Sequence, residues 1–210
     1  MVQRNRRRIK TNKREIVKFM VARGTAIESY SRIEQALVEL FAHLIGTSPD
    51  YAGIPFFRIN NARARNAIIE KLLKKRHGAT FNLFWNSLLN GKHGLNVLDG
   101  ERNEIVHWGM LAIFGKSNKL KGVKLIPQNY WDRNSNTPKK TTVEMWQFIS
   151  KCKFFSRALD MLRYVAAAQK PEHPAWRDIC QLPIVYPPPD NHLLSPKRKE
   201  LKIPHLPFPA

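Results

Sequence analysis

The side chains best suited to chemistry lie in one short segment of this chain, ERNEIVHW at residues 101–108. Arg102 and His107 are five positions apart, and Asn103 and His107, four apart, share one face of a helix. A histidine titrates near neutral pH and can accept or deliver a proton. An arginine stays charged and offers paired N–H donors to phosphate oxygens. These residue types together suit proton transfer at a phosphate ester.

RNA is the substrate that this set of side chains fits without a metal ion, because the 2′-hydroxyl of RNA is itself the nucleophile. DNA lacks that hydroxyl. We therefore assign proton transfer to His107, phosphate binding to Arg102 and an orienting hydrogen bond to Asn103, with Glu104 as a weaker candidate. The alternative is structural: a histidine that only packs on its helix, and an arginine that pairs with a neighbouring carboxylate.

The overall charge of the chain points to the same partner. Lys and Arg total 36 against 16 Asp and Glu, which gives a formal charge of +20 and a pI near 10.4. Such a field attracts phosphate backbones or anionic membrane surfaces. An uninterrupted apolar run of about 18 residues and a secretion signal are both lacking, so we expect no membrane partner and a cytoplasmic location. Cys152 and Cys180 lack metal-site spacing and are taken as ordinary thiols; neither a metal nor a cofactor is expected.

Two groups of basic residues are candidate RNA contacts. One is an arm over residues 1–14, which is either a disordered, solvated segment or a phosphate-binding one. The other is the polar face of a helix that begins at Asn60 or Asn61 and ends at Gly78; a solvated face is the alternative there. The RNA-binding candidates are Arg6, Arg7, Arg8, Arg63, Arg65, Lys74, Lys75 and Arg76.

The spacing of apolar residues predicts a mainly helical domain over residues 15–170 with one core. Helical spacing runs from Ile16 to Gly46 and is followed by a Ser-Pro-Asp loop at residues 48–50. Two further helices are predicted at residues 81–89 and 95–108, and the aromatic side chains of the first are assigned to the core. Period-two runs within about 109–127 predict a β-hairpin.

The last third of the chain closes the predicted domain and then changes character. A polar loop at residues 132–140 precedes a long helix, which Thr141 or Thr142 caps and which runs through Ala168. Residues 171–210 contain ten of the fourteen prolines and are predicted to form an extended tail without helix. Apolar residues between Trp176 and Tyr186 indicate that its first half packs on the domain.

The segment resembles the active-site motif of the HEPN ribonucleases, in which an arginine, often followed by a polar residue, is separated from a histidine by four to six intervening residues. Arg102, Asn103 and His107 match it, within a helical region of about residues 25–168. A second match, Arg198 with His205, lies in the proline-rich tail without a rigid element to hold it. The resemblance implies a HEPN-like antiparallel helical bundle, in which the hairpin is an insertion. It also implies a homodimer with a composite active site and products with 2′,3′-cyclic phosphate and 5′-hydroxyl ends.

Three functions remain open from the sequence. The first is a metal-independent endoribonuclease; the resemblance suggests a toxin or antiviral effector, for which an antitoxin or regulatory protein would be a further partner. The second is a nucleic-acid-binding protein without catalysis, in which the Arg/His pair is structural. The third is a scaffold that docks through residues 187–189.

Overall fold

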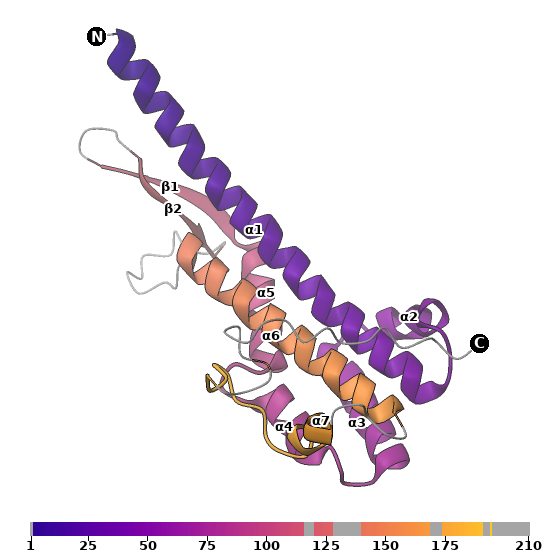
Figure 1. The fold of residues 1–210 in the computed structure, drawn as a ribbon. Coiled ribbons are helices and arrows are strands. Elements are labelled where there is room, and N and C mark those ends of the chain that lie inside the picture. Colours follow the sequence, from indigo (N-terminus) through magenta and orange to yellow (C-terminus); the bar gives the residue numbers. More distant parts are fainter. Residues whose placement is uncertain (1, 116–119, 128–139, 169–173, 191–193, 195–210) are drawn as a thin grey trace. The chain divides into compact units, whose positions relative to one another are not determined.

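The computed structural model is mainly helical, with one small antiparallel sheet (Figure 1). It describes residues 13–115, 120–127, 140–168, 177–190 and 194, and the backbone alone at 2–12 and 174–176. The helices are α1 (Val2–Ile45), α2 (Pro49–Arg58), α3 (Ala62–His77), α4 (Asn82–Asn90), α5 (Leu95–His107), α6 (Thr142–Ala167) and α7 (Pro174–Ile179). The strands are β1 (Gly109–Phe114), β2 (Leu120–Ile126) and β3 (Lys140–Thr141).

The chain forms two compact units. One contains residues 1–30 and 100–150, and the other contains residues 31–99 and 151–210. Three helices, α1, α5 and α6, continue from one unit into the other. The sequence indicated one core over residues 15–170, whereas the structure divides this stretch between two units.

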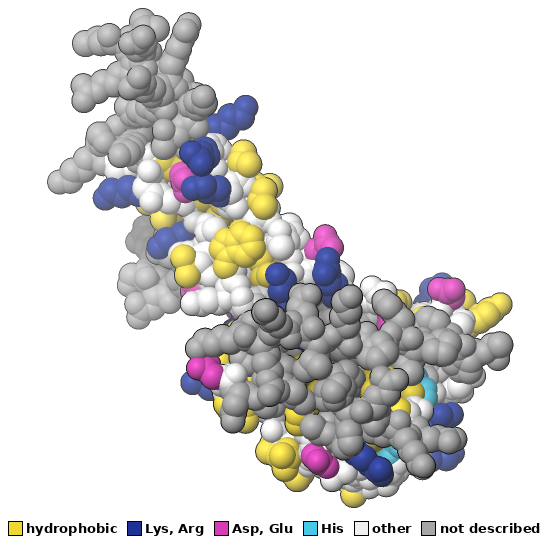
Figure 2. All heavy atoms as spheres, viewed as in Figure 1, with side chains coloured by type: hydrophobic (Ala, Val, Ile, Leu, Met, Phe, Trp, Pro, Cys, Tyr) yellow, Lys and Arg dark blue, Asp and Glu magenta, His cyan; other side chains and the backbone are white. Residues whose placement is uncertain are grey.

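The first unit contains the sheet and the beginning of α1. The strand order is β1-β2-β3, with Ala112 opposite Val123 in the predicted hairpin and a bulge between Ile113 and Phe114. The β3 strand was not predicted, since it is only two residues long. Most of the predicted polar loop before it lies outside the described residues. The buried side chains of this unit include Phe19, Ala22, Tyr30, Ile105, Leu125, Met145 and Phe148. Exposed apolar side chains also occur on α1, among Lys and Arg side chains (Figure 2).

The second unit is helical, and its helix ends follow the sequence signals. Gly46 adopts a φ of 74°, so that the backbone N–H of Thr47 reaches the carbonyl oxygen of Ala42 at 3.0 Å and closes α1. The side chain of Asn61 accepts hydrogen bonds from the N–H groups of Arg63 and Ala64, which confirms it as the cap of α3. The predicted core aromatics are confirmed as buried: Phe81, Phe84 and Trp85.

Two predictions about irregular segments were wrong, and a third segment had been left open. The open segment is the basic arm: its residues 2–14 continue α1 as helical backbone, which does not agree with the alternative of a disordered arm. The predicted loop at residues 48–50 instead begins α2, because Pro49 occupies the first turn, where no N–H is needed. Proline likewise begins α7 at Pro174, within the tail that was predicted to lack helix.

Other predictions about the end of the chain are confirmed. Thr141 and Glu144 form a reciprocal capping box at the start of α6, with the Thr141 N–H 2.6 Å from Glu144 Oε2. The first half of the tail packs on its unit, since Cys180 and Ile184 are buried and the Ile184 N–H donates to Ser87 Oγ. Among the residues that the structure describes, no helix is long and apolar enough to cross a membrane.

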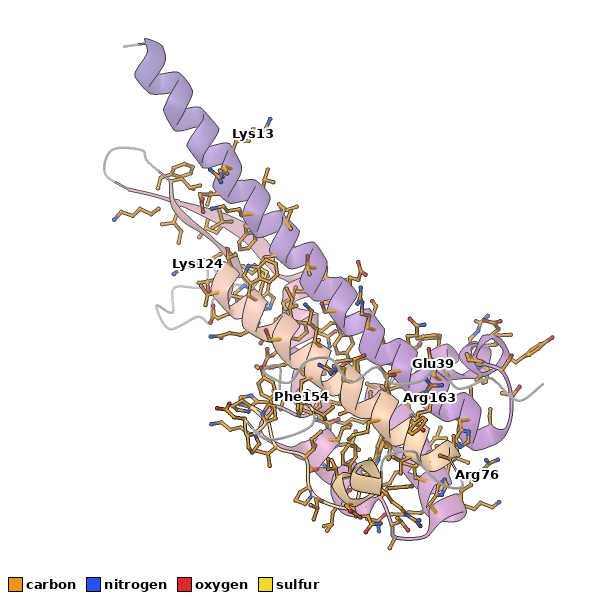
Figure 3. The ribbon with its side chains drawn as sticks, in the orientation of Figure 1. Lys13, Glu39, Arg76, Lys124, Phe154 and Arg163 are labelled. Carbon is orange, nitrogen blue, oxygen red and sulfur yellow. The ribbon has the colours of Figure 1, made fainter. Side chains whose placement is uncertain are left out.

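Asp160 on α6 gives a stability prediction. Burial and the nearby Glu39 raise its pKa to about 6, against the opposing effect of Arg163 and Arg157. Glu39 is itself paired with Arg163, 3.3 Å from Nη2 to Oε2 (Figure 3). Because the folded pKa lies above the ordinary value of 3.8, the folded protein binds this proton more tightly. The free energy of unfolding therefore falls between about pH 4 and pH 6 and stays low above pH 6.

We expect Asp160→Asn to raise the free energy of unfolding at pH 7.5 by roughly 1–2 kcal/mol and to change it little at pH 4, because the substitution removes the cost of ionising a buried carboxyl. Urea unfolding at both pH values measures this, with the exposed Asp178→Asn as the control. A gain of the same size at pH 4 would contradict the assignment.

Candidate functional site at the end of α5

The last two turns of α5 carry the candidate catalytic residues within the first unit. Ile105 is 1% exposed and anchors this part of the helix in the core. Asn103 and His107 are both exposed, as expected for residues four apart on the outward face. The helix therefore presents an amide and an imidazole to solvent from a fixed backbone.

Arg102 is held by two contacts. Its Nη1 atom donates to Asn103 Oδ1 at 2.9 Å, and its guanidinium carbon lies 5.8 Å from the centre of the Tyr30 ring. Tyr30 is buried and stacks on Phe148 with 6.4 Å between ring centres. An aromatic face attracts a guanidinium electrostatically, so this stack limits where Arg102 can move. The bond to Asn103 uses one of the five N–H donors of the guanidinium.

The C-terminus of α5 is bonded to a side chain of α1. Arg23 Nε donates to the carbonyl oxygen of Ile105 at 2.9 Å, and Arg23 Nη2 donates to those of Val106 at 2.8 Å and Trp108 at 3.1 Å. The last carbonyls of a helix lack partners within it, and its C-terminal end attracts positive charge. Arg23 therefore satisfies three acceptors on both sides of His107 and fixes the backbone from which that histidine projects.

Glu104, the weaker catalytic candidate, has a structural partner. Its Oε2 atom lies 2.8 Å from Lys140 Nζ, an ion pair whose lysine side chain is only 15% exposed. This pair connects α5 to β3. The alternative that Glu104 pairs with Arg102 is therefore not what the structure shows.

Arg102 and His107 are presented by one helix without direct contact between them. No hydrogen bond or ion pair joins them in the part of the chain that the structure describes. Five positions place them about 140° apart around an ideal helix, and the contact with Tyr30 keeps Arg102 half-buried while His107 is exposed. The end of α5 thus presents one exposed histidine, together with a partly buried cation.

The RNA-binding candidates of α3, in the second unit, divide into two classes. Arg63 and Lys75 are exposed, as is the neighbouring Lys71. Arg65 is structural, because its side chain is 12% exposed, pairs with Glu34 at 3.2 Å and lies 5.0 Å above the ring of Phe56. Arg63, Lys71 and Lys75 can therefore contact a phosphate backbone without breaking a buried ion pair.

The other basic candidates have partners or lie outside the described side chains. Lys74 is exposed and pairs with Glu70 on the next turn of α3. Arg76 donates to the carbonyl oxygen of His43 at 3.2 Å (Figure 3). The side chains of Arg6, Arg7 and Arg8 are not among those that the structure describes. No group of three or more possible metal ligands occurs among the described residues.

The two cysteines fit the interpretation as ordinary thiols. Both are free and buried, and burial raises the pKa of the Cys180 thiol to about 12. A thiol with such a pKa is protonated at neutral pH and is a poor nucleophile. Cys180 is therefore not a candidate nucleophile.

Sequence reasoning missed the residues that support the site. Arg23 and Tyr30 lie more than sixty positions before α5, and nothing in their spacing distinguishes them from other residues of a long amphipathic helix. Their roles depend on how α1 packs against α5 within the first unit. A sequence pattern could identify the helix but not the contact.

We expect Arg23→Met, which keeps much of the aliphatic stem, to lower the free energy of unfolding by about 1–3 kcal/mol, because three carbonyl groups lose a charged donor. Thermal unfolding measures the loss. The control is Lys13→Met, an exposed cation earlier on α1 that should change stability little. Equal effects of the two substitutions would show that Arg23 does not cap α5.

The geometry thus brings Arg102, Asn103 and His107 onto one supported helix end and places the basic α3 candidates in the other unit. Comparisons of the chain with protein-family models, with curated proteins and with solved structures found no match in any of the three.

Proposed function

We propose that this protein is a metal-independent endoribonuclease that acts through the α5 site. The observation that carries the proposal is the exposed His107 on a helix end that Arg23 fixes, with Arg102 positioned one turn earlier. A catalytic group needs a rigid backbone and access to substrate, and this arrangement provides both. The formal charge of +20 further supports a polyanionic substrate.

The reaction is a transesterification within RNA. The 2′-oxygen attacks the adjacent phosphorus while a histidine removes its proton, the bond to the 5′-oxygen breaks, and a protonated histidine delivers a proton to that oxygen. The products are a 2′,3′-cyclic phosphate and a 5′-hydroxyl. Arg102 would bind the non-bridging phosphate oxygens, whose negative charge becomes more concentrated in the transition state. Asn103, which accepts from Arg102, would keep the guanidinium oriented.

A homodimer would complete this site. The reaction uses one proton acceptor and one proton donor, and each chain presents one such histidine on α5. The same unit exposes apolar side chains on one face of α1: Val17, Met20 and Val21 are each at least 50% exposed. Their spacing of three and four positions forms a stripe that a second copy could cover. Both features favour a site formed by two chains.

His107 is the residue to test first. We expect His107→Ala to reduce the cleavage rate by about 10²–10⁴-fold, the usual contribution of acid–base catalysis. Purified protein is incubated with end-labelled RNA in EDTA, and the products are examined for 2′,3′-cyclic ends. Val97→Ala, an exposed apolar change earlier on α5, is the matched control and should cleave normally. An undiminished rate in His107→Ala protein would refute the assignment.

The dimer has its own test. We expect Met20→Glu to shift the protein from dimer to monomer and to reduce cleavage at least as strongly as it reduces dimerisation, because it buries a charge in the interface. Light scattering coupled to gel filtration measures the mass. Ile54→Glu on α2, equally a change from an exposed apolar residue to an acid, should leave the mass unchanged. An active wild-type monomer would overturn the composite site.

Nucleic-acid binding without catalysis is the second candidate, favoured by the exposed cations of α3, Arg63, Lys71 and Lys75. Both functions would weaken as salt increases. Only the enzyme would release cyclic-phosphate ends in EDTA, so the cleavage assay separates them. If the enzyme assignment holds, the family resemblance suggests a toxin or antiviral effector controlled by a partner protein.

A further inference from the structure

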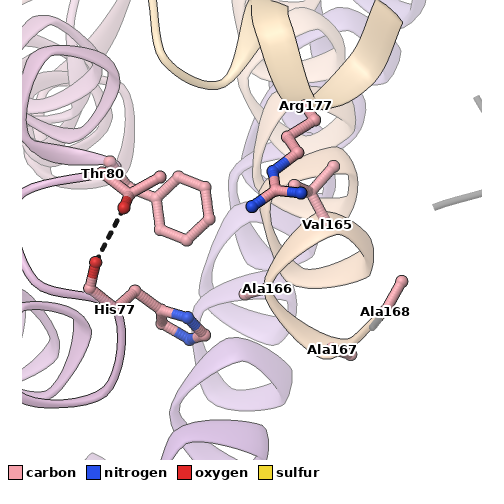
Figure 4. Close-up of a pocket in the computed structure, with 8 residues that line it drawn as sticks. His77, Thr80, Val165, Ala166, Ala167, Ala168 and Arg177 are labelled. Atoms are coloured by element: carbon pink, nitrogen blue, oxygen red, sulfur yellow. Dashed lines mark hydrogen bonds between the residues drawn. The ribbon is translucent and has the colours of Figure 1, made fainter. Parts of the chain in front are cut away.

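A cavity in the second unit is lined by none of the residues assigned to cleavage. It has a volume of about 240 Å³ and is bounded by the C-terminus of α3, the end of α6 and α7 (Figure 4). The residues that line it are His77, Thr80, Phe81, Val165, Ala166, Ala167, Ala168 and Arg177. Pockets for drug-sized ligands usually have about 300–1,000 Å³, so this one suits a single small ring system.

The polar groups of the cavity are a mixture of donors and acceptors. Figure 4 shows the Arg177 guanidinium and the His77 ring directed toward the space between residues 77–81 and α6. The Nε2 atom of His77 is buried and has no hydrogen-bond partner among the described residues. A buried polar atom without a partner is costly, which makes it a natural contact for a ligand.

The charge state of His77 bears on which ligand fits. Burial, and then the neighbouring Arg76, lower the pKa of His77, so the neutral ring is favoured. A neutral imidazole has one donor and one acceptor nitrogen, and the tautomer adjusts to its partner. The α6 helix also ends at this wall, where carbonyl oxygens without helical partners carry the negative end of the helix dipole. Both features oppose the attraction of the Arg177 guanidinium for an anion and favour an uncharged ligand with donors and acceptors.

The remaining walls are apolar and partly aromatic. Phe81 is 5% exposed and meets the His77 ring edge-on, with 5.2 Å between ring centres, and Val165 and the alanines of α6 form the opposite side. Thr80 closes the turn by donating to the His77 carbonyl oxygen at 2.8 Å. Flat apolar surfaces beside a few polar groups suit a planar heterocycle with a hydrogen-bonding edge.

We propose that this cavity binds a nucleobase. A base has two apolar faces for the walls formed by Phe81 and Val165, and an edge that can pair with His77 Nε2 and Arg177. Unpaired RNA bases are commonly recognised in this manner, by stacking and by hydrogen bonds to their edges. The site selects the base, whereas cleavage would take place at the phosphate; the inference does not depend on the cleavage activity.

The test uses the full chain and four uncharged probes, adenosine, guanosine, cytidine and uridine, with inorganic phosphate as the competing anion. Isothermal titration calorimetry measures binding. We expect saturable binding of at least one nucleoside, weakened roughly tenfold by Ala166→Leu, which fills the cavity beside His77 without changing charge, and by Arg177→Gln. Arg58→Gln, an exposed arginine at the end of α2, is the charge-matched control and should bind like the wild type.

Three results would overturn the proposal: no nucleoside binds, only phosphate binds, or Ala166→Leu binds as tightly as the wild type. Circular dichroism and thermal unfolding establish that each variant is folded. His107→Ala should keep nucleoside binding intact, so a failed cleavage assay and a failed base site are distinguishable. A protein that binds nucleosides but cleaves no RNA would retain the base site and lose only the ribonuclease assignment.

Discussion

Three hydrogen bonds from Arg23 hold the end of α5 within the first unit. Gly109, two residues after His107, begins β1 and lacks the positive φ with which a glycine closes a helix. Without the guanidinium, the carbonyls of Ile105, Val106 and Trp108 would lose a donor at the point where helix changes to strand. The position of His107 therefore depends on an α1 side chain, and so does any chemistry that requires this imidazole at a defined place.

The same unit uses aromatic stacking to place the neighbouring cation. Arg102 lies over Tyr30, which stacks on Phe148, so α1 and α6 both contribute to the surroundings of one α5 side chain. The Glu104–Lys140 pair adds a connection to β3. Each of these contacts is modest alone, but together they restrict α5 from several sides. Such rigidity matters for the proposed activity, because misplacement of a catalytic group by about 1 Å can cost two orders of magnitude in rate.

The sequence predicted those helices in which the spacing of apolar residues and a capping residue indicate the same boundary. Gly46 at the end of α1 and Asn61 at the start of α3 are examples. The prediction from sequence failed at prolines, which interrupt the interior of a helix but are favoured in its first turn. Pro49 and Pro174 were taken as breaks, but each begins a helix. The division into two units was also not predictable, since α1, α5 and α6 have continuous patterns across it. For the candidate site, spacing suggested Arg102, Asn103 and His107, while the contacts of Arg23 and Tyr30 depend on long-range packing that no local pattern encodes.

The basic side chains of this fold divide into those that are bonded within a unit and those that are exposed. Arg23 and Arg65 are bonded to carbonyl or carboxylate oxygens inside their units, and Arg163 pairs with Glu39. Arginine suits these positions because its planar donors serve several acceptors at once. The exposed charge on α3 consists instead largely of lysines, which act as solvated point charges. Net charge therefore predicts the class of partner but not the contact residues: some of the arginines that raise the pI stabilise the fold and are not available to RNA.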